Sequence, residues 1–192
     1  MRVNEILYTL QGEGYNTGKA AVFVRLAGCN LQCPFCDTNH HTFVEMTEDA
    51  IVEAITQHPA NMTVITGGEP ALQLTETLIA KIHAIGKTVA VETNGTMPLP
   101  PNVDWVTVSP KELYVGPEGR SIIKKANEVK VVFDGTHKIS DLGIEADHYY
   151  VQPCDTGNIQ ENKVITEKCA SFVKAHPRWQ LSLQTHKYIG IE

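Results

Sequence analysis

The chain has 192 residues, of which 42% are hydrophobic, and a net charge of -6. This length is sufficient for one sizeable core and short for two ordinary domains, so we expect a single domain spanning residues 1–192. The acidic balance argues against nucleic-acid binding, which uses clustered lysine and arginine, and favours a small-molecule substrate. The sequence has no signal-peptide pattern and no apolar stretch of about 18 residues, so we expect a cytoplasmic protein without a membrane span.

Apolar runs typical of strands alternate with helical patterns along the chain. The strand-like runs cover residues 22–26, 62–66, 88–92, 105–109, 129–133, 149–152 and 180–184. Helical spacing of apolar residues covers 48–57, 74–85 and 165–175, with Thr47 as a candidate cap and Gly86 as a stop. This alternation predicts βα units, a parallel sheet and right-handed crossovers.

The predicted crossovers differ in length. Residues 94–104 contain three prolines and leave no room for a packed helix between two predicted strands. We therefore expect an α/β fold in the form of an abridged, partial (β/α) barrel with mostly parallel strands. The first 20 residues precede its first unit and are interpreted as an N-terminal extension with a turn.

Polar segments follow the predicted strands at regular places. They cover residues 28–38, 67–70, 93–95, 110–111 and 153–155. In parallel βα architectures the loops after the strands open on one face, where ligands bind. These segments should therefore surround one site.

Three of the five cysteines lie within eight residues. Cys29, Cys33 and Cys36 form a C-x3-C-x2-C pattern, which suits a metal centre in a reducing compartment better than a disulfide framework. Three thiolates can hold three corners of a four-iron cluster and leave one iron without a protein ligand. A zinc site completed by His40 or His41 remains an alternative. Cys169 is interpreted as a small buried apolar side chain.

The cysteine pattern after the first predicted strand, with Phe35 before its last cysteine and Gly-Gly-Glu-Pro at 67–70, resembles the radical S-adenosylmethionine (SAM) superfamily. This resemblance implies a radical SAM barrel, a 4Fe–4S cluster, and SAM bound at the open iron and cleaved by one electron to give a hydrogen-abstracting radical. Four further segments, at 10–14, 36–38, 109–111 and 184–188, are similar to the 7-carboxy-7-deazaguanine synthase family of queuosine and deazapurine biosynthesis. Its members are lyases that convert 6-carboxy-5,6,7,8-tetrahydropterin to 7-carboxy-7-deazaguanine by radical ring contraction with loss of ammonia, assisted by Mg²⁺.

The family resemblance also implies roles for individual residues. It assigns the cluster to Cys29, Cys33 and Cys36 and Mg²⁺ to Thr38. The implied SAM site comprises Phe35, Cys36, Asp37, Gly68, Ser109, Pro110, Lys111, Gln152, Pro153, Cys154 and Asp155. The implied substrate site comprises Leu10, Gln11, Gly12, Arg25, Thr66, His186 and Glu192, the last standing where we expect relatives to end in proline. No separate catalytic residue is implied. An external one-electron donor such as a flavodoxin and a homodimeric state are implied as well.

The strand pattern gives independent support for Arg25. Alternation places Arg25 and Phe23 on one face and the apolar residues Val22, Val24 and Leu26 on the other, which should meet the helices. Arg25 then points into the barrel and needs an anionic partner. That partner is the substrate carboxylate in one interpretation and an internal Asp or Glu in the other. His186 is likewise open between binding the substrate carboxylate and a structural role.

Two other kinds of function share the cysteine loop. A glycyl-radical activating enzyme would act on a protein, but it has no evident use for the segment 10–14 or for a metal at Thr38. An iron–sulfur electron carrier or a zinc-binding interaction module would use the cysteines without SAM. The missing fourth local ligand counts against both of these.

Overall fold

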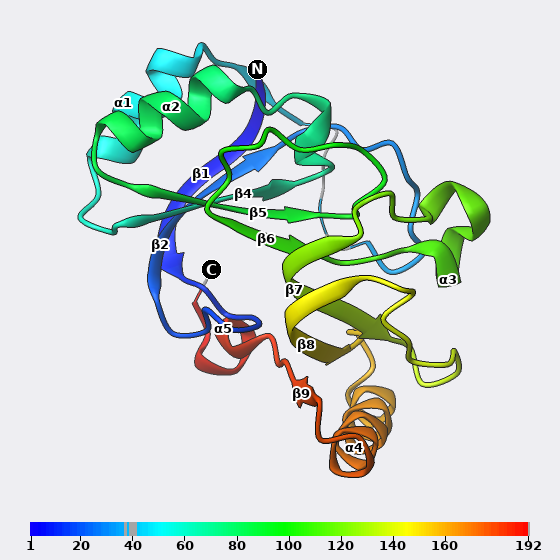
Figure 1. Cartoon of the computed structure of the whole chain (residues 1–192). Helices are drawn as coiled ribbons and strands as arrows, with labels where there is room; N and C mark the ends of the chain where they lie inside the picture. Colours follow the sequence, from blue (N-terminus) through cyan, green and yellow to red (C-terminus); the bar gives the residue numbers. More distant parts are fainter. Residues whose placement is uncertain (37, 39–41, 192) are drawn as a thin grey trace.

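The structure is a computed structural model that describes residues 1–36, 38 and 42–191. One curved sheet runs through the described part of the chain, in the order β3-β1-β2-β4-β5-β6-β7-β8-β9 (Figure 1). Its strands are β1 (Arg2–Leu10), β2 (Ala20–Leu26), β3 (Val44–Glu45), β4 (Met62–Gly67), β5 (Thr88–Thr93), β6 (Trp105–Val108), β7 (Lys125–Phe133), β8 (Glu145–Pro153) and β9 (Trp179–Leu181). All pairings from β2 to β9 are parallel, whereas β1 is antiparallel to both β2 and β3.

The helices are α1 (Glu48–Thr56), α2 (Glu76–Ala84), α3 (Glu112–Val115), α4 (Ile159–Ala175) and α5 (Thr185–Ile189), with 3-10 turns η1 (Pro70–Leu72) and η2 (Gly116–Gly119). Helices α1, α2 and α4 cover the outer face of the sheet, whereas α3 lies beyond the strand ends (Figure 1). The short α5 lies beside the loop between β1 and β2 (Figure 1). None of the described helices combines the length and apolar character of a membrane span.

The outer faces of the strands bury the main apolar clusters. Val22, Val24 and Leu26 pack with α1 and α2 in one cluster, and α4 covers β7 and β8 in a second. A small inner cluster contains Phe23. The alternation inferred for β2 is therefore confirmed: its aliphatic side chains face the helices, and Phe23 and Arg25 face the barrel interior.

The interpretation of the first 20 residues as an extension with a turn missed β1, which pairs with β2 over most of its length. Its alternation is weak because the strand lies near the edge of the sheet, and side chains on both of its faces are partly exposed. The short edge strand β3 was also missed. The partial barrel therefore begins with two antiparallel strands.

Two other boundaries differ from the sequence interpretation. Helix α4 begins at Ile159, six residues earlier than expected, because Asn158 caps its N-terminus by accepting hydrogen bonds from the amides of Gln160 and Glu161. Its first turns are solvent-exposed and so carry no apolar periodicity; Ile159 is 82% exposed. The last strand ends at Leu181, and residues 182–184 lead instead into α5.

The shortened crossovers are as expected. In the described structure, no helix lies between β5 and β6, where the prolines occur, or between β7 and β8. The α/β partial barrel is confirmed, and its trimmed connections account for a complete curved sheet in a short chain.

Candidate active site

A pocket of about 260 Å³ opens at the carboxyl ends of the parallel strands. Loops after β2, β4, β5, β6 and β8 contribute to it, together with inward side chains of β7, the β1–β2 loop and α5. The structure thus brings the polar strand-end segments together. Of the candidate residues that it describes, the following line the pocket: Leu10, Gln11, Gly12, Arg25, Cys29, Cys33, Phe35, Cys36, Thr38, Thr66, Gly68, Ser109, Lys111, Gln152, Pro153, Cys154, Asp155 and His186. Pro110 does not line it, and Asp37 and Glu192 lie outside the described residues.

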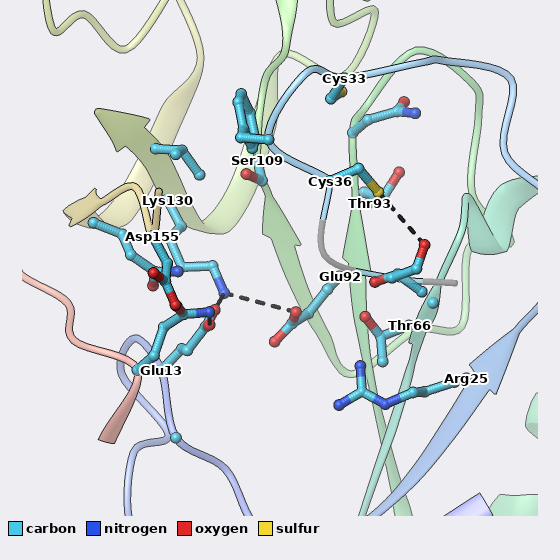
Figure 2. Close-up of a pocket in the computed structure, with 18 of the residues that line it drawn as sticks. Glu13, Arg25, Cys33, Cys36, Thr66, Glu92, Thr93, Ser109, Lys130 and Asp155 are labelled. Atoms are coloured by element: carbon cyan, nitrogen blue, oxygen red, sulfur yellow. Dashed lines mark hydrogen bonds and ion pairs between the residues drawn. The ribbon is translucent and has the colours of Figure 1, made fainter. Parts of the chain in front are cut away.

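The cysteine loop forms one side of the pocket (Figure 2). Cys29 and Cys33 are partly buried, Cys36 is exposed, and all three are free thiols. Burial raises the pKa of Cys29 and Cys33, so an electropositive partner is needed to hold them as thiolates. Among described residues, no three His, Cys, Asp or Glu side chains converge on a site for one metal ion. A four-iron cluster does not require the cysteines to converge on one point, because each cysteine binds its own iron. His40 and His41, the candidates for completing a zinc site, lie outside the described residues.

The Gly-Gly-Glu-Pro turn after β4 holds the cysteine loop in place. The amide of Gly68 donates to the carbonyl of Leu26 at 2.8 Å, and that of Glu69 donates to the carbonyl of Gly28 at 2.9 Å. A Cβ atom on Gly68 would overlap the Gly28 carbonyl, so the close approach of the two loops requires glycine.

Glu69 extends this connection to β5. Its side chain is fully buried and accepts hydrogen bonds from the Thr93 hydroxyl at 2.7 Å and the Asn94 amide at 2.8 Å. A buried carboxylate with several donors is strongly fixed. Three successive strand-end loops are therefore rigidly joined at the pocket wall.

Lys111 and Phe35 lie on the wall next to the cysteines. The Lys111 ammonium donates to the carbonyl and hydroxyl oxygens of Ser109 at 2.7 and 2.6 Å, and burial lowers the pKa of Lys111. It lies 6.0 Å from the centre of the Phe35 ring, which makes an edge contact with Tyr114. This wall combines a cation and an aromatic face, which suits a ligand with a carboxylate and a flat ring.

Asp155, in the loop after β8, joins the pocket to the C-terminal segment. It pairs with Lys187 at 2.6 Å, and this hydrogen bond is the main reason that the pKa of Asp155 is lowered to about 2. The backbone amide and the hydroxyl of Thr185 both donate to the carbonyl of Gly12, at 3.0 and 2.9 Å. These contacts place His186 in the pocket lining beside the β1–β2 loop.

A charged cluster forms the opposite side of the pocket from the cysteines. Lys130 lies between Glu13 and Glu92, pairing directly with Glu13 and at 3.6 Å with Glu92 (Figure 2). Gln184 donates to Glu13 and Gln11 donates to Glu92, each at 2.9 Å. Residues from β5, β7, the β1–β2 loop and the C-terminal segment therefore meet in one network, which we call the floor cluster and define as Glu13, Glu92 and Lys130.

The floor cluster is charged despite its burial. Burial alone would raise the pKa of Glu13, but the charge and hydrogen bond of Lys130 outweigh it and lower this pKa to about 2. Burial alone would lower the pKa of Lys130, but the surrounding glutamates raise it above its usual range. The network is thus a set of fixed charges at the edge of the pocket.

Arg25 lines the pocket and also has an acidic partner. Its Nε atom lies 3.1 Å from Glu5, which faces it from β1. Both side chains are partly exposed, at 33% and 44%, so solvent screens this pair. Thr66, on the neighbouring strand, lies next to Arg25 in the pocket (Figure 2). The geometry leaves the guanidinium accessible to a ligand and gives it an internal partner as well.

The floor cluster contains the site residues that the sequence interpretation missed. Glu92 and Lys130 are charged residues at inward positions that alternate with buried valines, the same signal that identified Arg25. Glu13 belongs to the segment 10–14, which was singled out without a role for this side chain. Alternation within β5 and β7 could have found two of the three.

The partial barrel and its three-cysteine pocket define a radical SAM protein, and the model of the radical SAM superfamily matches residues 23–158. A 7-carboxy-7-deazaguanine synthase from Bacteroides thetaiotaomicron is 47% identical over 99% of this chain and 98% of its own length. A protein of the same name from Bordetella pertussis is 41% identical, covering 98% of both chains. The crystal structure of QueE from Escherichia coli matches with a TM-score of 0.74 and 26% identity, over 95% of this chain and 92% of that one.

This chain belongs to the 7-carboxy-7-deazaguanine synthase family of radical SAM enzymes. Membership implies a 4Fe–4S cluster and SAM as cofactors. The comparisons support this reading over a glycyl-radical activating enzyme and over an iron–sulfur or zinc protein without SAM chemistry.

Proposed function

We propose that this chain converts 6-carboxy-5,6,7,8-tetrahydropterin to 7-carboxy-7-deazaguanine by radical ring contraction with loss of ammonia. The observation that carries this proposal is that one pocket has three free cysteines on one side and the floor cluster on the other. The similarity to relatives that bear the name of this activity supports it.

The donor set fits the cofactors. Three cysteines on one loop match three irons of a four-iron cluster and leave the fourth for SAM. When bound, the cluster and SAM supply one-electron cleavage and hydrogen abstraction. Gly68 allows close backbone approach, and Ser109, Lys111 and the residues from Gln152 to Asp155 lie along the same wall, where we assign SAM binding. Asp37 and Pro110 carry the same assignment only from the family resemblance.

The pterin substrate fits the other side. Its ring amine and amide groups are hydrogen-bond donors, and the carboxylates of the floor cluster retain lone pairs after their internal contacts. Its carboxylate suits Arg25, with Leu10, Gln11, Gly12, Thr66 and His186 around the ring. We assign substrate binding to these residues, and Glu192 keeps this role as a prediction.

We assign Mg²⁺ to Thr38. This residue lines the pocket close to the last cysteine, where its hydroxyl is a suitable hard ligand. Mg²⁺ usually retains several waters and shares oxygen ligands with its substrate, so one protein oxygen is a sufficient anchor. When bound, the ion would supply positive charge for an anionic substrate group.

The decisive experiment is anaerobic incubation of the reconstituted enzyme with SAM, a one-electron reductant and carboxytetrahydropterin. We expect 7-carboxy-7-deazaguanine and ammonia, identified by mass spectrometry and an ammonia assay. The Cys33→Ala variant is the negative control, and Cys169→Ala is the matched positive control because Cys169 is buried in α4, as the sequence predicted. A wild-type enzyme that cleaves SAM without forming the deazaguanine would contradict the substrate assignment.

Four wider expectations remain predictions. We infer that residues 1–192 form one domain, which the continuous sheet supports. We also infer a homodimer, an external one-electron donor such as a flavodoxin, and a cytoplasmic location. Light scattering tests whether the protein is a homodimer. Reduction kinetics with purified flavodoxin test the electron donor.

A further inference from the structure

A third glutamate lies beneath the floor cluster and is more deeply buried than Glu13 and Glu92. Glu128 is on β7, two residues before Lys130, so both side chains point into the barrel. It is only 2% exposed, whereas its strand neighbours Val129 and Val131 pack outward against the apolar cluster under α4. Glu128 does not line the pocket, and the proposed reaction gives it no role.

The β1–β2 loop covers Glu128 closely. The backbone amide of Tyr15 donates to the carboxylate at 2.9 Å. A Cβ atom on Gly14 would overlap this carboxylate, and Gly14 has a φ of 64°, so glycine is required on both grounds. The Tyr15 ring stacks on His148 and Trp105, with centroid distances of 4.2 and 5.0 Å, and closes the barrel below the glutamate. The loop that supplies Glu13 to the pocket therefore also seals Glu128 in.

The charges around Glu128 do not balance when every group is ionised. Glu13 and Glu92 both pair with Lys130, so one buried ammonium already serves two carboxylates. Glu128 is a third carboxylate in the same region. Tyr150 and His148 on β8 and Tyr15 on the β1–β2 loop also face this part of the interior. Two other ammonium groups lie further out: Lys19 donates to Asn16 beside the Tyr15 ring, and Lys111 acts on Lys130 from the opposite wall. Lys130 is the cation whose charge acts on Glu128.

We propose that Glu128 carries an exchangeable proton that sets the net charge of the floor cluster, which makes Glu128 a positioning residue for the substrate. With the proton present, Lys130 serves Glu13 and Glu92 alone, and the cluster carries one excess negative charge. After the proton leaves to solvent, a second excess negative charge lies below the floor and disfavours an anionic substrate. Burial and the two neighbouring glutamates raise the pKa of Glu128 to about 7, which places this change near neutral pH.

The effect on substrate binding rests on the proposed function. The proton on Glu128 does not, because it can be observed without substrate. Infrared difference spectroscopy of the reconstituted full chain should show a protonated carboxyl band that disappears with a midpoint near pH 7. The band should be absent from Glu128→Gln, which retains an oxygen to accept from Tyr15. It should persist in Glu145→Gln, a matched control whose side chain is 75% exposed.

A second variant keeps the test informative if Glu128→Gln does not fold. Glu92→Gln removes a neighbouring negative charge, so the midpoint of the band should shift to lower pH. A wild-type protein without a titrating band between pH 5 and 9, or an unmoved midpoint in Glu92→Gln, would overturn the proposal.

The kinetic consequence is measured separately. The KM for carboxytetrahydropterin should rise with pH through 7 in the wild type, on the order of tenfold for one added charge at an effective dielectric constant of about 20. In Glu128→Gln this dependence should disappear, while kcat changes little. Should the enzyme not turn over the pterin at all, the proposed function fails while the infrared result stands. Normal turnover with identical pH profiles in both proteins refutes the positioning role.

Discussion

The cysteine loop and the floor cluster face each other across one pocket and are organised in opposite ways. The thiols of the loop are partly exposed, and burial disfavours the thiolates that a cluster requires. The floor cluster is largely buried, and its members pair with one another and with Gln11 and Gln184 in the absence of a ligand. The first region is completed by its cofactor, whereas the second is assembled by folding. Mutations should therefore damage chemistry on one side and both stability and binding on the other.

The largest effect is expected on the cysteine side. Changing Cys29, Cys33 or Cys36 singly to Ala should abolish SAM cleavage, because each change removes one of three protein ligands. Since these side chains are not core residues, the melting temperature of the metal-free protein should change little. Deoxyadenosine formation and iron content measure the loss. Normal cleavage with an intact cluster in one of the three variants would contradict the assignment.

The opposite pattern is expected from Lys130→Met. Removing the ammonium leaves Glu13 and Glu92 buried without their cation, which should cost about 3–5 kcal/mol of unfolding free energy. Denaturant titration measures this loss. Lys125→Met is the matched control on the same strand: its pair with Glu145 is exposed and 4.0 Å long, and its loss should cost less than about 1 kcal/mol. Similar losses in the two variants would show that the floor cluster is not a distinct stabilising unit.

A smaller and more selective effect is expected from Arg25→Met. Loss of a charge-assisted contact worth about 1.5–3 kcal/mol should weaken carboxytetrahydropterin binding by at least about tenfold and leave the cluster and SAM binding intact. Calorimetric titration gives the affinity.

The control for Arg25 is a tetrahydropterin analogue without the carboxylate, which should bind the variant and the wild type alike. Glu5→Gln removes the internal partner seen in the structure and should leave carboxytetrahydropterin binding nearly unchanged. If Arg25 acts mainly through Glu5, both ligands lose affinity to the same extent and the protein loses thermal stability.

The smallest effect is expected from Thr38→Ala. It should weaken the activation of turnover by Mg²⁺ and leave cluster assembly intact, because the hydroxyl serves the magnesium ion and not the iron. A magnesium titration of product formation measures the change, and the iron content is the control. Superimposable titration curves would remove Thr38 from the metal site.

Much of the fold and of the cysteine side was predictable because both leave local signals. Apolar runs predicted the parallel strands, and the spacing of three cysteines predicted the cysteine loop that now lines the pocket. The strand β1 was missed because its residues are partly exposed on both faces, so burial leaves no clear period. The start of α4 at Ile159 was missed because it is determined by the Asn158 cap and lies six residues before the first buried residue of the helix, Ile165.

The floor cluster was missed for a different reason. Its members come from a loop and two strands far apart in sequence, and each is an isolated charge until the sheet curls and brings them together. The inward positions of Glu92 and Lys130 were readable from alternation, but their mutual contact depends on the curvature of the sheet.

The contact between the C-terminal segment and the β1–β2 loop has a consequence for the order of events in the cell. Gln184 donates to Glu13, and Thr185 donates to Gly12, so two pocket residues from the start of the chain depend on residues synthesised about 170 positions later. During synthesis these contacts cannot form before the last residues of the chain are made, and closing so long a loop costs chain entropy. A ribosome-bound chain can build its early strands and hold the cysteine loop while the pocket still lacks one wall. Cluster loading during translation would therefore meet an open site, and the substrate side closes only when synthesis is complete.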